Sequence, residues 1–174
     1  MSDSLSDSLQ ARKMIHDDAL VILAWRNHPE VRRHMFTRHE ISPEEHLQWY
    51  EKSVGNPLKH MLIIQVGKSP IGFVNFDTSK TGLIAEWGFY VAPHVPRGTG
   101  RGVCRTALSY AFGTLNLHKI CGEVLAENHR SLRLHQALHF KQEGVFHDQH
   151  FDGEEYHDVI RFGLLSKEWR SLSD

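Results

Sequence analysis

The chain has 174 residues, of which 40% are hydrophobic and 24% charged, a composition typical of a single globular domain. Its 20 lysines and arginines nearly balance 21 aspartates and glutamates, giving a formal net charge of −1. This balance excludes the basic field needed for general nucleic-acid binding or attachment to an anionic membrane. No apolar run approaches the roughly 18 residues of a membrane span, and two cysteines are too few for a disulfide framework. We therefore expect a cytoplasmic protein.

Local patterns predict a helix near the start of the chain. Residues 1–13 are polar and serine-rich, and we expect them to form a disordered leader before a single domain over residues 14–174. Asp17 and Asp18 precede an apolar run, which predicts a helix that ends before Pro29.

A second predicted helix is followed by segments with the apolar pattern of strands. Residues 42–45 (SPEE) form a capping box with proline at the first helical position, and they predict a second helix. Apolar runs at residues 61–66 and 71–76, separated by a GKSP turn, predict a hairpin. Residues 84–91 (IAEWGFYV) predict a third strand.

The second half of the chain alternates between the two kinds of element. A helix is predicted over residues 103–115, a buried strand over 120–126 and a helix beginning at Asn128. Two further strands are predicted near residues 141–147 and 156–164. This order predicts an α/β domain with one mixed sheet flanked by helices.

A turn rich in glycine and arginine, residues 96–102 (PRGTGRG), lies between the third strand and the following helix. Backbone N–H groups and the positive end of a helix dipole at such a place can hold phosphate oxygens. The spacing fits neither a Walker loop nor a Rossmann fingerprint. On these grounds alone, an anion site and a plain flexible turn are both open.

The pattern R-x-x-G-x-G at residues 97–102, after GFYVAP at 88–93, resembles the acetyl-CoA-binding segment of the GCN5-related N-acetyltransferases (GNAT). Residues 127–131 (ENHRS) and 134–144 (LHQALHFKQEG) resemble the segment that follows it in this family. The resemblance runs from about residue 15 to the C-terminus. It implies a mixed sheet with splayed central strands, acetyl-CoA as cosubstrate and no metal.

The resemblance also implies which residues bind the cofactor. The Val91 N–H would face the thioester oxygen as a preorganised donor, and Asn128 would form a hydrogen bond with the pantetheine arm. The full set expected at the cofactor is Phe89, Tyr90, Val91, Arg97, Gly98, Thr99, Gly100, Arg101, Gly102, Val103, Asn128, Ser131 and His135.

Two carboxylates are candidates for the base that accepts the proton of the amine. Glu123 lies within an apolar strand, where desolvation would raise its pKa and make it a better base; Glu86 lies in a similar setting. The resemblance favours Glu123, and the alternative for each is an outward-facing strand residue. His135 stands where the family usually has the tyrosine proposed as the acid, so we expect either an acid or a histidine that only lines its helix.

The N-terminal half narrows the resemblance. Residues 25–29 (WRNHP), Met35 and residues 44–47 (EEHL) resemble the N-acetyltransferases of pseudaminic acid biosynthesis, which act on the 4-amino group of a UDP-linked 4-amino-4,6-dideoxy sugar. This resemblance implies a nucleotide-sugar acceptor and direct transfer in a ternary complex. Expected substrate-binding residues are Arg26, His46 and Tyr90; for Arg26, a salt bridge at the end of its helix is the alternative.

Other functions remain open at this stage. The acceptor could instead be a protein N-terminus or another small amine, or the domain could bind acyl-CoA without catalysis. The family commonly forms dimers, but the sequence specifies no interface. A histidine- and aspartate-rich stretch superficially resembles a metal site, but lacks a second closely spaced ligand pair, so we expect a solvated hairpin. Its members are His147, Asp148, His150, Asp152, His157 and Asp158.

Overall fold

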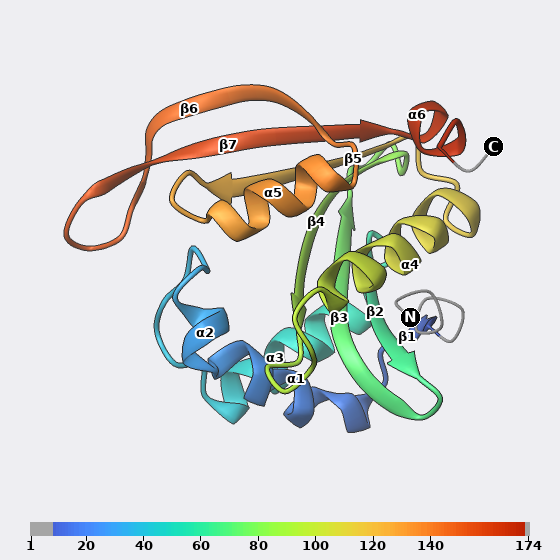
Figure 1. Cartoon of the computed structure of the whole chain (residues 1–174). Coiled ribbons are helices and arrows are strands. Elements are labelled where there is room, and N and C mark those ends of the chain that lie inside the picture. Colours follow the sequence, from blue (N-terminus) through green and yellow to red (C-terminus); the bar gives the residue numbers. More distant parts are fainter. Residues whose placement is uncertain (1–8, 173–174) are drawn as a thin grey trace.

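The computed structural model describes residues 9–172, and within this range the chain forms one seven-stranded sheet with helices on both faces (Figure 1). In chain order the elements are β1 (Leu9–Lys13), η2 (His16–Asp18), α1 (Ala19–Asn27), α2 (Pro29–Arg32), α3 (Pro43–Val54), β2 (Lys59–Val66), β3 (Ser69–Thr78), β4 (Ile84–Val91), α4 (Thr99–Gly113), β5 (Lys119–Leu125), α5 (His129–Ala137), β6 (Lys141–Phe151), β7 (Tyr156–Leu165) and α6 (Ser166–Arg170). Across these residues, no helix combines the length and apolar character of a membrane span.

The sheet has the strand order β1-β2-β3-β4-β5-β7-β6, and only β4 and β5 are parallel neighbours. Their pairing is short: it runs from Ile84 opposite Lys119 to Glu86 opposite Cys121. Beyond these residues the two strands separate, as Figure 1 shows. The structure therefore confirms the predicted mixed α/β fold with splayed central strands.

Each face of the sheet has its own hydrophobic core. Successive side chains of a strand point to opposite faces, so Phe73 packs with α1 and α3 while Val74 packs beneath α4 and α5. Helix α4 lies very close to β3, because a side chain at Gly72 would place its first carbon 2.6 Å from the Val103 side chain. These contacts fix α4 on the sheet beside the end of β4.

Strand β1 corrects the predicted leader. Residues 9–13 pair antiparallel with β2, from Leu9 opposite Val66 to Lys13 opposite Leu62, and residues 1–8 lie outside the described part of the chain. Leu9 and Ala11 pack against the core beneath α4. This short alternation of apolar and polar residues stabilises a strand despite the polar composition of the segment.

Other boundaries also differ from prediction. Helix α4 begins at Thr99 rather than at residue 103, because Gly98 adopts a φ of +94° at its N-cap and turns the chain into the helix early. Half of the glycine-rich turn is therefore the first turn of α4. Strand β6 continues to Phe151, and the short helices α2 and α6 were not predicted.

Candidate active site

The separation of β4 from β5 exposes backbone groups of β4. Ala92 N–H donates to the Ile71 carbonyl (2.9 Å), so these residues form a hydrogen-bonded pair between β3 and β4. Such pairs alternate with pairs that form no hydrogen bonds across an antiparallel ladder. Gly72 and Val91 are the next pair in register, and the Val91 N–H therefore points away from β3. It points into the gap that β5 leaves.

A cavity of about 430 Å³ fills this gap. Its walls are residues 87–91 of β4, residues 123–125 of β5, the start of α4 and the inner face of α5. Residues 34–36, from the loop after α2, close a further side. The cavity thus lies between two strands that have separated, and it is bordered by the N-terminus of a 15-residue helix.

The first turn of α4 borders one end of this cavity, with the Thr99 and Arg101 N–H groups donating to the Pro96 and Gly98 carbonyls at 3.3 and 3.2 Å. The first N–H groups of a helix have no partner within the helix, and the helix dipole places partial positive charge there. Gly98, Gly100 and Arg101 line the cavity from this turn. A first side-chain carbon at Gly100 would lie in ordinary contact with Val91 (3.7 Å) and Leu134 (3.9 Å), which places this residue between β4 and α5.

Most of the residues predicted at the cofactor line this cavity. They are Phe89, Tyr90, Val91, Gly98, Gly100, Arg101, Asn128, Ser131 and His135. Arg97, Thr99, Gly102 and Val103 were predicted as well but lie outside the lining. The Val103 side chain is fully buried in the core under α4, so any contact of this residue with the cofactor would come from its backbone.

A second cavity of about 300 Å³ contains all three residues predicted to bind substrate: Arg26, His46 and Tyr90. It shares lining residues with the first cavity, namely Met35, Gly88, Phe89 and Tyr90. The two cavities therefore meet at the exposed segment of β4. A molecule in the second cavity would border residues 88–90, next to Val91 of the first cavity.

The second cavity holds buried polar atoms that lack partners. Within residues 9–172, Nη1 of Arg26 and Nε2 of His46 are buried without a hydrogen bond. Arg26 Nη2 donates to the Thr37 carbonyl at 2.6 Å, rather than forming the salt bridge left open as an alternative. Burial lowers the pKa of both side chains and raises that of the Tyr90 phenol. A bound ligand would satisfy these orphaned groups.

The carboxylates of this cavity are already paired. Asp77 accepts from the Lys59 ammonium at 3.1 Å, and Glu45 contacts the ring of His39 at 3.1 Å. Among the described cations that line this cavity, Lys59 has a carboxylate partner, whereas the half-buried Arg26 donates to the Thr37 carbonyl and keeps Nη1 without a partner.

Glu123 and Glu86 are not the desolvated carboxylates that were predicted. Their side chains are 41% and 52% exposed, and both accept hydrogen bonds from Arg161. Both residues lie on the sheet face away from α4 and α5, beyond the part that α1 and α3 cover. Glu123 still lines the first cavity, but Glu86 does not.

His135 is buried, and both of its ring nitrogens have hydrogen-bond partners within the described residues. Trp87 Nε1–H donates to His135 Nε2 at 3.2 Å, so the ring carries its proton on Nδ1 and donates it to the Ser131 carbonyl at 2.9 Å. Burial lowers the pKa of His135 to about 4. Gly122 makes room for this pair, since a side chain there would begin 2.7 Å from Trp87 Nε1. The geometry matches the open alternative, a histidine lining its helix.

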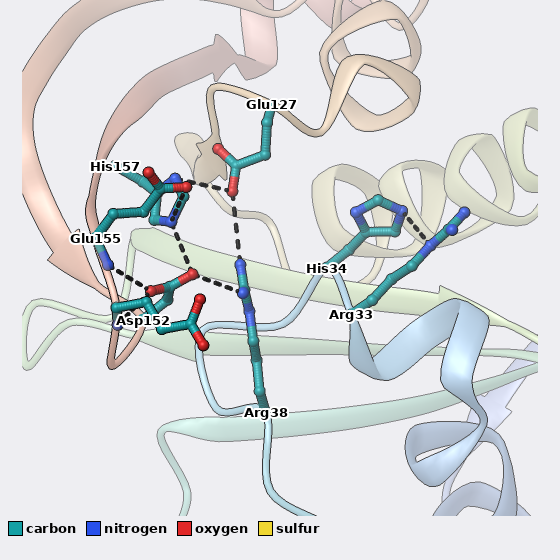
Figure 2. Close-up of polar contacts among 8 residues, drawn as sticks. Arg33, His34, Arg38, Glu127, Asp152, Glu155 and His157 are labelled. Atoms are coloured by element: carbon teal, nitrogen blue, oxygen red, sulfur yellow. Dashed lines mark hydrogen bonds and ion pairs between the residues drawn. The ribbon is translucent and has the colours of Figure 1, made fainter.

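Ion pairs join the loop after α2 to the β6–β7 hairpin at the rim of the first cavity. Arg38 lies between Asp152 (2.8 Å) and Glu127 (3.6 Å) in Figure 2. His157 contacts the same two carboxylates, at 2.9 and 3.4 Å. We call these four residues the rim network. Among the described residues, no group of three or more side chains is arranged to hold a metal ion.

Arg161 is the site residue that the sequence did not reveal. It lies opposite Glu123 in the antiparallel register of β5 and β7. A single arginine near the end of the chain carries no motif, and only this register brings it beside the two candidate bases.

Comparisons with known proteins agree with this geometry. The family model "Acetyltransferase (GNAT) domain" matches residues 9–141. The chain is 30% identical over 120 residues to acetyltransferase PseH from Campylobacter jejuni subsp. jejuni serotype O:23/36 (strain 81-176), covering 69% of this chain and 74% of that relative. It is 26% identical over 173 residues to spermidine N(1)-acetyltransferase from Vibrio cholerae serotype O1, covering 98% of this chain and 100% of that one.

A solved structure is similar over nearly the whole chain. The crystal structure of spermidine N-acetyltransferase from Vibrio cholerae in complex with CoA and spermine has a TM-score of 0.85 and 26% sequence identity. The match covers 94% of this chain and 99% of that one.

Proposed function

The chain belongs to the GNAT family of acetyltransferases, and on that premise we propose that its acceptor is the 4-amino group of a UDP-linked 4-amino-4,6-dideoxy sugar, as in pseudaminic acid biosynthesis. Membership in this family makes the protein an N-acetyltransferase with acetyl-CoA as its cosubstrate. The identity of the acceptor is the new part of the proposal.

The first cavity suits the cofactor. The pantetheine arm would lie between β4 and β5, with its diphosphate at the first turn of α4, where helical N–H groups favour anions. The Val91 N–H, which points into this gap, would donate to the thioester oxygen and stabilise the charge that develops there.

Transfer would be direct. The amine attacks the thioester carbonyl, the carbon–sulfur bond breaks, and coenzyme A leaves as a thiolate. Burial raises the pKa of both the Cys104 and Cys121 thiols, which disfavours either thiolate as a nucleophile for an acyl-enzyme. Glu123, at the edge of the first cavity, would accept the proton of the amine. Because His135 is neutral with both nitrogens bonded, water is the donor we assign to the departing thiolate.

The observation that carries the acceptor assignment is the unpartnered Arg26 Nη1 in the second cavity. A buried guanidinium N–H needs an oxygen acceptor, and a diphosphate or a uracil carbonyl supplies one. His46 Nε2 needs a partner as well, and sugar hydroxyls can provide it. The similarity to PseH supports this acceptor independently.

Spermidine is a second candidate, because similarity to the Vibrio cholerae spermidine acetyltransferase spans almost the whole of both chains. A polyamine carries several positive charges and requires free carboxylates. In the second cavity Asp77 pairs with Lys59 and Glu45 contacts His39, while Arg26 would repel a cation. The charge distribution therefore favours the nucleotide sugar.

A comparison of acceptors tests this proposal. The protein is incubated with acetyl-CoA and either a panel of UDP-4-amino sugars or spermidine, and products are followed by thiol release and mass spectrometry. We expect one acetyl group on a single sugar stereoisomer. We also expect Arg26→Gln to raise the KM for that sugar about tenfold, the loss of one charged hydrogen bond of about 1.5 kcal/mol. Efficient acetylation of spermidine with no sugar product would establish the second candidate instead.

A further inference from the structure

We infer that Arg161 is a positioning residue for acetyl transfer: it holds Glu123 at the mouth of the first cavity and uses Glu86 as its anchor. The inference rests on the proposed role of Glu123 as the base. It adds a function for Arg161 and a role for Glu86 other than that of an alternative base.

The three residues meet where the sheet divides. Glu86 is the last residue of β4 that pairs with β5. Cys121 of β5 is the partner of Glu86, and Glu123 lies two residues further along β5 on the same face. Arg161 lies directly opposite Glu123 on β7. One guanidinium therefore connects three strands at the point where β4 and β5 separate.

The contacts with the two carboxylates are unequal. Arg161 binds Glu86 with both terminal nitrogens, and the bond from Nη1 to Oε2 measures 2.7 Å. It binds Glu123 with Nη1 alone, at 3.1 Å from Oε1. The two-point contact orients the planar guanidinium. The single contact orients Glu123 while leaving its other oxygen, Oε2, available to accept a proton.

This arrangement addresses two requirements of a base. A glutamate that is 41% exposed samples several side-chain conformations, and the bond to Arg161 selects one of them. A base must also be ionised before it accepts a proton, yet a full positive charge beside it would weaken it. Glu86 shares the charge of Arg161, so that Glu123 experiences only part of it.

Other charged or titratable groups among the described residues share this face. Asp77 of β3 lies directly opposite Glu86 and forms an ion pair with Lys59 of β2 at 3.1 Å. Cys121 on β5 lies near Arg161, and Lys119 on β5 forms an ion pair with Glu143 of β6 at 2.7 Å. The Lys119–Glu143 pair lies on the same face, one step along β5 from Cys121, and makes a matched control.

The experiment compares Arg161→Met, Arg161→Lys and Glu86→Gln with the control Lys119→Met. Steady-state rates are measured with the UDP-4-amino sugar and with spermidine as acceptors. We expect Arg161→Met to lower kcat about tenfold while the KM for acetyl-CoA stays within twofold, and Arg161→Lys to recover part of the loss. Lys119→Met should match the wild type.

The split between kcat and KM separates positioning from a purely structural role. A residue that orients the base should change kcat while the KM for acetyl-CoA stays constant, and Arg161→Lys should recover part of kcat because it keeps one donor for Glu123. Glu86→Gln should lower kcat less than Arg161→Met, since Arg161 keeps its bond to Glu123.

The outcomes distinguish this inference from the proposed function. A wild-type kcat in Arg161→Met would overturn the role of Arg161, whichever acceptor is used. A wild-type kcat in Glu123→Gln would remove the base and the positioning role together. Turnover of spermidine alone, with the predicted loss of kcat in Arg161→Met, would overturn the sugar assignment and leave the role of Arg161 standing.

Discussion

At the scale of single residues, burial determines what His135 can contribute. Its side chain is 2% exposed and stacks on Phe162. Trp87 and the Ser131 carbonyl occupy both ring nitrogens. Protonating the ring would set Nε2–H against Trp87 N–H, so the neutral form is strongly preferred. The same histidine at an exposed helix position would be charged in mildly acidic solution.

This preference predicts a pH-dependent stability. The folded-state pKa of about 4 lies below the ordinary value of 6.5, so the unfolded chain binds more protons between these values. The contribution of this histidine to the free energy of unfolding is therefore constant above pH 6.5, and it decreases as the pH falls from 6.5 toward 4. Urea unfolding should show that the wild type loses about 3 kcal/mol more than His135→Gln between pH 7 and pH 4. Comparing the two proteins cancels the contributions of other buried histidines. Equal losses would contradict the neutral assignment.

Gly98 provides a second test at this scale. Its φ of +94° at the N-cap of α4 is a conformation that residues with a side chain rarely adopt. Gly98→Ala should destabilise the protein by about 1–2 kcal/mol in urea unfolding and weaken acetyl-CoA binding several-fold in calorimetry.

Gly113 is the matched control for this substitution. It lies at the other end of α4, where a side chain would meet open space, and alanine there should be neutral or stabilising. If Gly98→Ala were as stable and as tight a binder as Gly113→Ala, the N-cap would not depend on glycine.

At the scale of elements, the site depends on the separation of β4 from β5 and on the start of α4 within the glycine-rich turn. The pairing of β4 with β5 ends at Glu86, and α4 begins at Thr99. The end of the β4–β5 pairing makes the gap, and the start of α4 places helical N–H groups at the end of that gap. Neither element forms a binding site alone.

The rim network predicts an effect on binding rather than on chemistry. Arg38 and His157 join the loop after α2, whose Met35 lines both cavities, to the β6–β7 hairpin. Exposed ion pairs contribute up to about 1 kcal/mol. Arg38→Gln should therefore raise the KM for the acceptor about two- to fivefold with kcat unchanged, and high salt should produce a similar change in the wild type.

Arg33→Gln is the control for the rim network. Arg33 lies in the same loop, but its ion pair joins Glu30 within the same segment, at 2.8 Å. Steady-state kinetics at low and high salt should leave this variant close to the wild type. If both arginine variants raised the KM equally, loss of charge near the cavity rather than docking of the loop would be the cause.

At the scale of the whole molecule, local patterns predicted the elements, and the register between distant strands determined the rest. Caps and apolar periods were sufficient for the mixed sheet, and the glycine-rich turn for the segment beside the first cavity. The family resemblance, rather than these patterns, pointed to Arg26, His46 and Tyr90, which line the second cavity. Strand β1 was missed because its alternation covers only five residues within a polar segment. Arg161 could not be predicted, since its contact with Glu123 joins residues 38 positions apart.

The two cavities lie on different sides of β4. One lies between β4 and β5, the other lies beside α1 and α3, and they meet at residues 88–90. A cofactor and an acceptor can therefore approach the same short segment of β4 from different sides. This arrangement is what a direct transfer between two bound molecules requires.

A crystal structure of the protein with acetyl-CoA tests this account most directly. We predict the diphosphate at the first turn of α4, the pantetheine arm between β4 and β5, and the thioester oxygen within hydrogen-bonding distance of the Val91 N–H. A cofactor bound elsewhere, or an empty gap between β4 and β5 at saturating cofactor, would contradict it.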